Sequence, residues 1–270
     1  MSRQALLIIP THLRKKEHIE ILAKCVKTLR ESTDDELLII DDGSPMSQAD
    51  KDSVFHSITE VAKDNIRIHY KDDNTGFSDT VNVGLERALE NQKDACLINS
   101  DIEFVEYGWL DEMKNTDADI VGALLLYPNY VIQHAGIYFS VISRAFHHRF
   151  AGCPPNLPVA LEPCECPVTG ALQYIRHEVL DDIGIYDEDY KLGMEDVDFM
   201  IRAIKGGHRS LYNPKVKALH HESLIRRDKS DKIEEWEMDS YKHLIQKWKE
   251  VGFSDVAPTL MEKNAVSSRA

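Results

Sequence analysis

Short apolar runs alternate with amphipathic stretches over the first hundred residues. Between the runs, apolar residues recur every three or four positions, which is the spacing of a helix with one buried face. The runs themselves are continuous, as in strands that are buried on both faces of a sheet. The resulting order β-α-β-α-β-α-β predicts an α/β fold with a mostly parallel sheet and helices on both sides. The predicted strands are residues 5–9, 37–40, 66–70 and 96–98.

The second half of the chain has a less regular pattern. Apolar runs at 120–126, 133–139 and 170–175 predict further strands with longer connections, which suits a mixed sheet. Residues 142–168 contain five prolines, and we expect them to form one long binding loop or lid. A helix is predicted over residues 195–205, where two glycines end it.

Composition and charge narrow the class of protein. The 270 residues include 32 Lys and Arg against 46 Asp and Glu, a net charge of −14, and 43% are hydrophobic. This is a globular composition, and its negative charge disfavours general binding to a nucleic-acid backbone. The longest apolar runs are far below the roughly 18 residues of a membrane helix, and no signal-peptide core is visible. We therefore expect a cytoplasmic protein without a membrane span.

The five cysteines are unevenly spread, which is typical of reduced thiols in a cytoplasm. Cys153, Cys164 and Cys166 could bind zinc together with His147 or His148. However, Cys164 and Cys166 lack the two-residue gap that zinc knuckles commonly have. Small partly buried side chains in a loop-rich segment are the preferred interpretation.

Polar motifs follow three of the four early strands, and open α/β sheets bind ligands at this edge. The motifs are Pro10-Thr11-His12, Asp41-Asp42-Gly43-Ser44 and the segment 99–103. Within the last, Asp101 and Glu103 are hard oxygen ligands that suit Mg²⁺ or Mn²⁺ carrying a diphosphate. Taken alone, this acidic pair fits a solvated turn equally well. The chain has neither a phosphate-binding glycine loop nor a dinucleotide fingerprint, so side chains and a metal would have to hold a nucleotide.

A second acidic cluster, Glu195, Asp196 and Asp198, lies at the start of the predicted helix 195–205. Acidic residues in a first turn are favoured by the helix dipole, so capping explains part of the cluster. Like charges this close also raise one another's pKa, which is the condition for a general base. His220 follows another apolar run, and it is either structural or a metal ligand.

Taken together, the motifs resemble those of the inverting nucleotide-sugar glycosyltransferases of family 2, which have the GT-A fold. The resemblance covers about residues 5–223 and depends on the order of the motifs rather than on any single one. The motifs are IIPT (8–11), IIDDGS (39–44), NTGF (74–77), NVG (82–84), LINSDIE (97–103), QHAG (133–136), VTGA (168–171), GIYDE (184–188), GMEDVD (193–198) and HH (220–221).

The resemblance implies a domain organisation and a donor site. One GT-A domain would span residues 1–225, with a nucleotide-sugar-binding half at 1–103, an acceptor-binding half at 104–225 and a helical extension at 226–270. The nucleotide sugar would be held by Pro10, Thr11, Asp41, Asp42, Asn74, Gly76, Asn82 and Ser100.

The resemblance also implies a metal and a base. Asp101 and Glu103 take the place of the family's D-x-D, and His220 matches a histidine near the diphosphate. These residues would bind Mn²⁺ or Mg²⁺, with Asp101 the firmer ligand because Glu103 is longer than the usual aspartate. Asp196 matches the base that takes the proton of the acceptor hydroxyl. The acceptor or supporting residues would be Glu195, Asp198, Gly170 and His134.

The expected function is transfer of one sugar from a nucleoside-diphosphate sugar, taken to be UDP-linked, with inversion at the anomeric carbon. The acceptor would be a glycan, lipid, protein or small molecule. A hydroxymethylated DNA base, as in some phages, stays open, because basic and aromatic residues are concentrated at 144–150 and at Arg226, Arg227 and Lys229. Two other classes of protein are alternatives to a glycosyltransferase: a nucleotidyltransferase and a non-catalytic nucleotide-sugar-binding module. The acidic motif at 193–198 disfavours the first, and the presence of Asp101, Asp196 and His220 disfavours the second.

Overall fold

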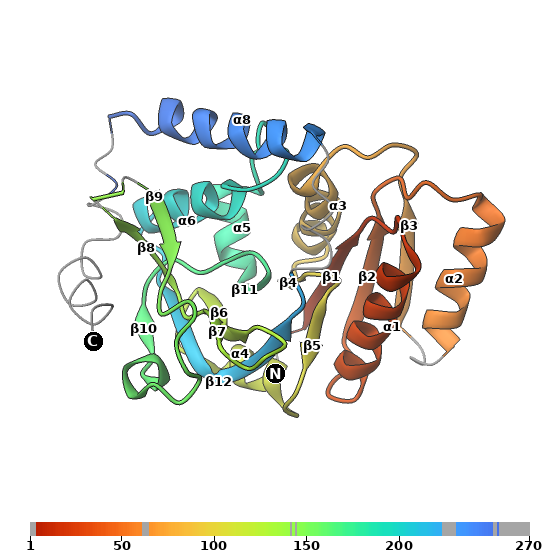
Figure 1. The fold of residues 1–270 in the computed structure, drawn as a ribbon, viewed down its shortest axis with the longest axis horizontal. Helices are drawn as coiled ribbons and strands as arrows, with labels where there is room; N and C mark the ends of the chain where they lie inside the picture. The colour runs from red at the N-terminus through yellow and green to blue at the C-terminus, as the bar shows by residue number, and fades with distance from the viewer. Residues whose placement is uncertain are drawn as a thin grey trace.

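The first half of the chain forms the predicted parallel sheet (Figure 1). Its strands are β1 (Ala5–Thr11), β2 (Glu36–Asp41), β3 (Ile66–Tyr70) and β4 (Asp94–Ile98). Every residue of β1 and β4 is buried, which explains their uninterrupted apolar sequence. The structure is a computed structural model that describes residues 4–60, 65–140, 142–143, 145–222, 231–250 and 253.

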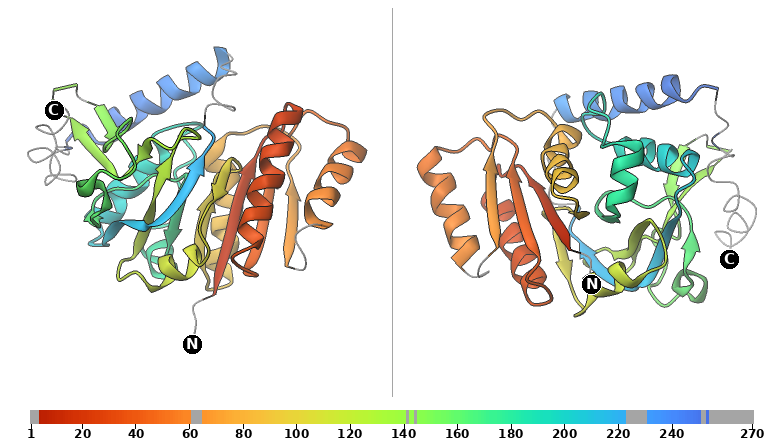
Figure 2. Two further views of the ribbon diagram at one scale, coloured as in Figure 1. Left: turned by 60° about the horizontal axis from the view of Figure 1, so that its bottom comes forward. Right: turned by 180° about the vertical axis from the view of Figure 1, so that it is seen from behind.

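Helices cover both faces of this sheet, as expected (Figure 2). The helices are α1 (Lys16–Arg30), α2 (Gln48–Glu60) and α3 (Phe77–Glu90). Leu22 of α1 belongs to one hydrophobic cluster and Leu85 of α3 to another, and the sheet separates the two. The central strands therefore contribute alternate side chains to two cores.

The second half extends the same sheet with strands of both directions. These strands are β5 (Ile102–Phe104), β6 (Ile120–Leu126), β11 (Leu172–Ile175) and β12 (Ser210–His220). Strand β11 lies antiparallel between β4 and β6, while β12 runs parallel to β6 and antiparallel to β5. The pairing of β12 with β5 brings His220 beside the turn that follows β4.

Short strands complete the large sheet, which has ten strands in the described part of the chain. They are β7 (Ile132–His134), paired with β6, and β10 (Cys164–Glu165), paired with β12. The order is β10-β12-β6-β11-β4-β1-β2-β3, and a hairpin of β8 (Ile137–Ser140) and β9 (Ala145–His148) stands apart from it. The expectation of a parallel first half and a mixed second half is confirmed.

Two expectations about the second half are wrong. The predicted strand at 133–139 is divided into β7 and β8, because Gly136 between them has φ +98°. The segment 142–168 is not one loop, since it contains β9, a 3₁₀ helix η1 (Pro158–Leu161) and β10. Its backbone is tied to the rest of the domain, for example where the Arg149 N–H donates to the Gly136 carbonyl over 2.8 Å.

Four further helices lie in the described part of the chain, and the last of them lies across the top of the molecule in Figure 1. They are α4 (Trp109–Asn115), α5 (His177–Ile183), α6 (Glu195–Lys205) and α8 (Asp231–Lys247). Leu244 of α8 is fully buried against α6, so this helix packs on the domain as its amphipathic pattern predicts.

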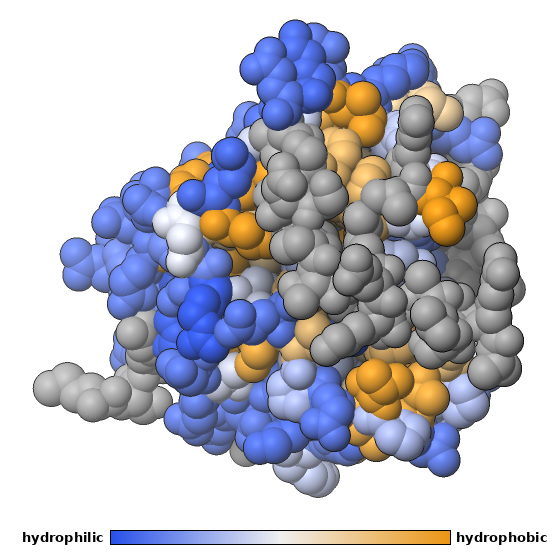
Figure 3. Space-filling view, turned by 90° about the vertical axis from the view of Figure 1, so that its left-hand side faces the viewer, coloured by the Kyte–Doolittle hydropathy of each residue, from blue (hydrophilic) through white to orange (hydrophobic). Residues whose placement is uncertain are grey.

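On the face shown in Figure 3, separate hydrophobic groups lie among hydrophilic residues. Among the described residues, no helix has the length and apolar character needed to cross a membrane.

Candidate active site

One cavity of about 540 Å³ runs from the carboxyl ends of β1 and β4 to the start of α6. It collects most of the site residues that the sequence predicts, although they are far apart in the chain. The predicted residues that line it are Pro10, Thr11, Asp42, Asn74, Gly76, Ser100, Asp101, His134, Gly170, Glu195, Asp196 and His220. Four predicted residues do not line it: Asp41, Asn82, Glu103 and Asp198.

At one end of the cavity, Asp42 organises the loop before α3. Its Oδ1 accepts the Thr75 N–H over 3.0 Å and lies 3.0 Å from Lys71 Nζ, and its Oδ2 accepts the Gly76 N–H over 3.3 Å. Gly76 has φ +108°, and a Cβ there would lie 2.6 Å from the Lys191 carbonyl oxygen. Glycine is therefore required where this loop meets the segment that leads to α6.

Three buried polar atoms of residues that line this end have no hydrogen-bond partner among the described residues. They are Thr11 Oγ1, Arg14 Nε and Asn74 Oδ1. Buried polar groups in folded proteins almost always have partners, so these atoms are candidates for contact with a bound ligand.

Asp41 and Asn82 were predicted to touch the nucleotide, and the structure places both away from the cavity. Asp41 is fully buried, and its carboxylate accepts from Ser44 and pairs with Lys51 at 2.8 Å. Asn82 exchanges two hydrogen bonds with the backbone of Tyr186, at 2.9 and 3.0 Å. Both side chains therefore brace loops that carry other site residues.

In the middle of the cavity, Asp101 Oδ1 lies 3.2 Å from His220 Nε2. His220 Nδ1 lies 2.7 Å from Gln133 Oε1, and the Gln133 amide nitrogen donates to Glu222 over 2.6 Å. Because an amide oxygen only accepts, His220 Nδ1 carries a hydrogen, and a neutral His220 presents the lone pair of Nε2 to Asp101. Two acceptors at this distance need a proton or a metal cation between them.

The electrostatics agree with a site for positive charge. Burial on its own raises the pKa of Asp101, but positive charge and a hydrogen bond at His220 lower it by more, so the pKa lies below its usual value when a proton occupies Nε2. The Asn99 amide nitrogen lies 3.4 Å from His220 Nε2, and its Oδ1 is buried without a partner among the described residues. Asp101, His220 and Asn99 thus form a donor set that fits a divalent cation.

Glu103 was predicted as a second metal ligand, and the structure does not bring it to this place. Its Oε2 lies 2.7 Å from Lys24 Nζ and 2.9 Å from His221 Nε2, outside the cavity. The reason is the turn at 99–102, closed by the Ile102 N–H to the Asn99 carbonyl, which rotates Asp101 away from the direction of Glu103.

At the far end of the cavity, Asp196 stands half-buried in the first turn of α6. Its Oδ2 accepts the Gly170 N–H over 3.1 Å, and its Oδ1 accepts the Val197 N–H over 2.8 Å. A Cβ at Gly170 would lie 2.9 Å from the Tyr186 hydroxyl, so close packing against Tyr186 favours glycine at this position. The carboxylate is fixed by backbone groups while it still faces the cavity, which is the arrangement that a general base requires.

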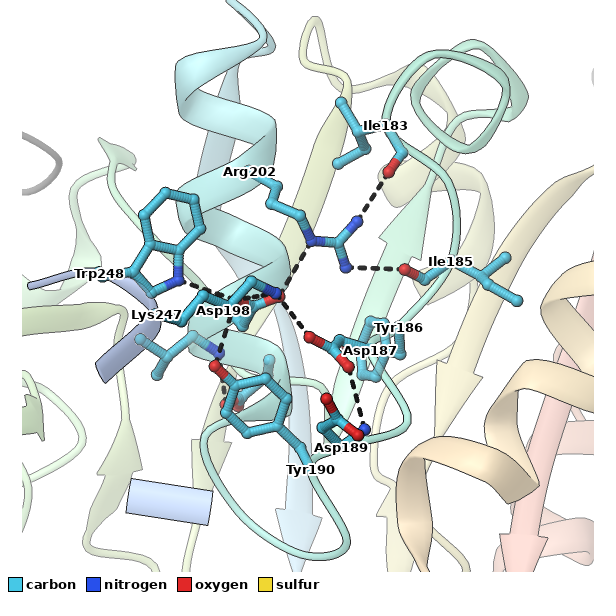
Figure 4. Close-up of polar contacts among 12 residues, drawn as sticks. Ile183, Ile185, Tyr186, Asp187, Asp189, Tyr190, Asp198, Arg202, Lys247 and Trp248 are labelled. Carbon is cyan, nitrogen blue, oxygen red and sulfur yellow. Dashed lines mark hydrogen bonds and ion pairs between the residues drawn. The ribbon is translucent and has the colours of Figure 1, made fainter. Parts of the chain in front are cut away.

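Asp198 lies two residues after Asp196, about 200° further round α6, so it faces away from the cavity. It organises a buried network instead (Figure 4). Its carboxylate is fully buried and accepts from Arg202 Nε at 3.0 Å, Trp248 Nε1 at 2.8 Å and the Tyr190 hydroxyl at 3.3 Å. Lys247 Nζ lies 2.8 Å away. Asp198 therefore joins α6 to the end of α8.

Three cavity residues that are not among the predicted site residues complete the site. Gln133 fixes His220, and it directly precedes His134 in the QHAG motif. Phe146 of β9, which belongs to the basic and aromatic segment 144–150, and Trp236 of α8 also line the cavity. His134 is fully buried, and burial together with His148 holds its pKa well below the usual value, so it is neutral.

Other predicted features carry no metal or lie outside the described residues. Arg144, Arg226, Arg227 and Lys229 lie outside them. The cysteines form no group with metal-ligand spacing in the part of the chain that the structure describes. The acidic group Asp187, Asp189 and His243 lies outside the cavity, and Lys247 Nζ already pairs with Asp187 at 2.6 Å.

Comparison with known sequences agrees with the geometry. The sequence model of Glycosyl transferase family 2 matches residues 6–134. The chain is 31% identical, over 48% of its length, to O-antigen biosynthesis protein RfbC of Myxococcus xanthus, of which it covers 11%. It is 39% identical, over 23% of its length, to N-acetylglucosaminyl-diphospho-decaprenol L-rhamnosyltransferase of Mycobacterium tuberculosis, of which it covers 22%.

The longest similarity is to the uncharacterized protein y4gI of Sinorhizobium fredii, 27% identical over 96% of this chain and 29% of that protein. The chain thus spans less than a third of each of these three relatives. The crystal structure of GalNAc-T7 with UDP, GalNAc and Mn²⁺ superposes with a TM-score of 0.63 at 14% identity, covering 81% of this chain and 44% of that one. The fold is the GT-A fold, and the first half of the chain, residues 6–134, matches glycosyl transferase family 2.

We expect Asp198→Asn to lower the free energy of unfolding by roughly 3 kcal/mol, because Arg202 loses its buried counter-charge. Urea denaturation followed by tryptophan fluorescence measures this loss. Asp189→Asn is the matched control, since the Asp189 side chain is 77% exposed in the segment before α6. Equal stability of the Asp198→Asn variant and the wild type would contradict the role assigned to this network.

We expect Gln133→Met to weaken Mn²⁺ binding about 10- to 100-fold, because His220 loses the acceptor that fixes its tautomer. Calorimetry in the presence of UDP measures the affinity, and ¹⁵N NMR of the His220 ring reports the tautomer without metal. The exchanged pair Gln133→Glu with Glu222→Gln keeps an acceptor and a donor in place, and it should restore both readouts. Unchanged affinity and tautomer in Gln133→Met would show that Gln133 does not position His220.

Proposed function

We propose that the chain is a metal-dependent, inverting glycosyltransferase that moves one sugar from a UDP-linked donor to an acceptor hydroxyl. The observation that carries this proposal is the order of groups along one cavity. Unpartnered polar atoms of Thr11 and Asn74 lie at one end, Asp101 and His220 in the middle, and Asp196 at the other end. In a nucleotide sugar, the nucleoside, the diphosphate and the sugar follow one another, and the acceptor lies beyond the sugar. The groups that would contact these parts therefore have to follow the same order along the cavity.

Asp101 and His220 would hold the cation, with Asn99 beside them. A bound cation would supply the positive charge that stabilises the departing nucleoside diphosphate. A ligand set that includes an imidazole favours Mn²⁺, because Mg²⁺ takes oxygen ligands almost exclusively. The solved structure of GalNAc-T7, which contains UDP and Mn²⁺, supports the choice of donor and metal through its similar fold.

Asp196 acts as the base in this proposal. Its carboxylate is fixed by the N–H groups of Gly170 and Val197, so it accepts the proton of the acceptor hydroxyl without reorientation. The acceptor oxygen then attacks the anomeric carbon from the side opposite the diphosphate. Attack from that side inverts the configuration, and no covalent sugar–enzyme intermediate is required.

The acceptor end of the cavity favours a sugar as the acceptor. Phe146 and Trp236 offer apolar ring surface near Asp196 and Glu195, and carboxylates beside aromatic rings suit hydroxyl groups on a pyranose. The names of two relatives, an O-antigen biosynthesis protein and an N-acetylglucosaminyl-diphospho-decaprenol L-rhamnosyltransferase, support a sugar acceptor as well. We therefore prefer a glycan, free or lipid-linked, to a DNA base.

The function is tested by incubating the chain with a panel of nucleotide sugars, with Mn²⁺, Mg²⁺ or a chelator. We expect slow Mn²⁺-dependent release of UDP from a UDP-sugar, and none with the chelator. A dTDP-linked deoxysugar is included because of the rhamnosyltransferase relative. Pyrophosphate release from nucleoside triphosphates would instead indicate a nucleotidyltransferase, and no turnover of any donor would contradict the proposal.

We expect Asp196→Asn to lower the transfer rate by at least about 100-fold while nucleotide affinity changes little, because only the base is lost. Transfer is followed by UDP release in the presence of acceptor, and affinity by calorimetry. Asp181→Asn, an exposed carboxylate on α5, serves as the control. Normal turnover by Asp196→Asn would remove this residue from the mechanism.

We expect Trp236→Ala to raise the KM for a glycan acceptor about tenfold and to leave the KM for the donor unchanged. The spacing of α8 supports this, since Trp236 lies one turn before Ser240, whose Oγ is 3.5 Å from the Leu192 N. Trp236→Phe should keep most of the affinity. Met238→Ala, at an exposed position of the same helix, is the control. An equal rise of the acceptor KM in Trp236→Ala and Met238→Ala would exclude a specific contact with the Trp236 ring.

A further inference from the structure

A buried arginine lies behind the acceptor half of the cavity without a carboxylate partner. Arg149 is only 4% exposed, and none of the ion pairs between described residues includes it. One guanidinium nitrogen donates to the Ala135 carbonyl over 3.2 Å, while Nε has no hydrogen-bond partner among the described residues. A buried guanidinium charge is costly unless a negative group compensates it.

The side chains that face this arginine are thiols. Cys164 and Cys166 contact each other and Arg149, and Cys166 Sγ lies 3.5 Å from the Cys164 carbonyl oxygen. Gly136 shows how tightly the groups converge. A Cβ there would lie 2.4 Å from Cys166 Sγ and 3.2 Å from Arg149 Cδ.

We propose that Cys164 and Cys166 form an oxidisable thiol pair, in which Cys164 is a thiolate paired with Arg149 and Cys166 is the resolving thiol. The geometry supports this, because Cys166 directly follows strand β10 and its N–H donates to the Ser210 carbonyl of β12 over 3.2 Å. In an extended chain, residues two apart project to the same side. Cys164 is also partly exposed, whereas Cys166 is buried. This site is separate from glycosyl transfer and does not depend on the proposed function.

The oxidant would be a peroxide. The Cys164 thiolate attacks the O–O bond, which gives a sulfenic acid and releases the alcohol or water that contains the other oxygen. The Cys166 thiol then attacks the Cys164 sulfur, the S–S bond forms, and the sulfenic oxygen leaves as water. Two thiols and one peroxide thus yield one disulfide, one water and one further water or alcohol.

The charges around the pair act in the required direction. The hydrogen bond from Cys166 lowers the pKa of Cys164, burial opposes this, and Arg149 lowers it further, to about 6. Glu165 raises the pKa of Cys164, but Arg209 pairs with that carboxylate at 2.7 Å. Tyr212, opposite Cys164 on β12, is neutral, since burial raises the pKa of its hydroxyl. Cys25 and Cys96 are fully buried, and burial raises the pKa of both thiols, so they stay unreactive.

The full chain is treated with iodoacetamide across pH 5–9, and the modification of each cysteine is followed by peptide mass spectrometry. We expect Cys164 to react with a half-maximal rate near pH 6, against about pH 8.5 for an ordinary thiol. Cys153, which is also partly exposed, is the internal reference. Arg149→Met should slow the reaction of Cys164 at pH 7 about tenfold, and Arg149→Lys should slow it less.

In a second measurement, hydrogen peroxide is added and the mass of the peptide that contains both cysteines is measured by mass spectrometry. We expect loss of two hydrogens in the wild type and in Cys153→Ser, and in Cys166→Ser a sulfenic acid at Cys164 that dimedone captures. The proposal is overturned if Cys164 reacts only above pH 8, or if peroxide leaves the pair reduced. The wild-type pH profile decides the matter even if the Arg149 variants fail to fold.

Discussion

A carboxylate can be buried only if positive charge or hydrogen-bond donors compensate it, and this constraint connects the fold to the site. Asp42, Asp101 and Asp198 are all buried, and each is compensated in a different way. Asp42 uses Lys71 and backbone N–H groups, Asp101 uses His220, and Asp198 uses side chains of α6 and α8. Each of these contacts joins segments that are separate in sequence, so the cavity exists only when the whole domain is assembled.

The contact between Asp101 and His220 shows what the second half contributes. The family match ends at residue 134, before Asp196 and His220. His220 reaches Asp101 because β12 pairs with both β6 and β5, which returns the chain to the edge where β4 ends. The antiparallel strand β11 beside β4 similarly brings Gly170 close to Asp196. The first half of the sheet is therefore completed by β11, which runs against its direction, and by β12, which runs with it.

The order of the strands and most of the residues that line the cavity could be predicted from the sequence, because continuous apolar runs and polar strand ends are local signals. The sequence was insufficient where side-chain direction depends on a turn or on a distant segment. Asp101 and Glu103 are two apart, yet the turn at 99–102 sends them to different places. Asp198 matched an active-site motif, but its direction follows from the helical period of α6 and from Trp248, fifty residues away.

Helix α8 has two roles, and no sequence motif indicates either of them. Trp248 and Lys247 compensate Asp198, and about three turns earlier on the same helix Trp236 lines the acceptor end of the cavity. The first contact fixes the helix on α6, two residues from Asp196, so the position of Trp236 depends on a network that never touches substrate. The end of the cavity that we propose for the donor is built from the loops after β1, β2 and β4, and Trp236 is the described α8 residue that lines the cavity. Substitutions on this helix can thus alter the acceptor without disturbing the nucleotide, provided that Asp198 keeps its partners.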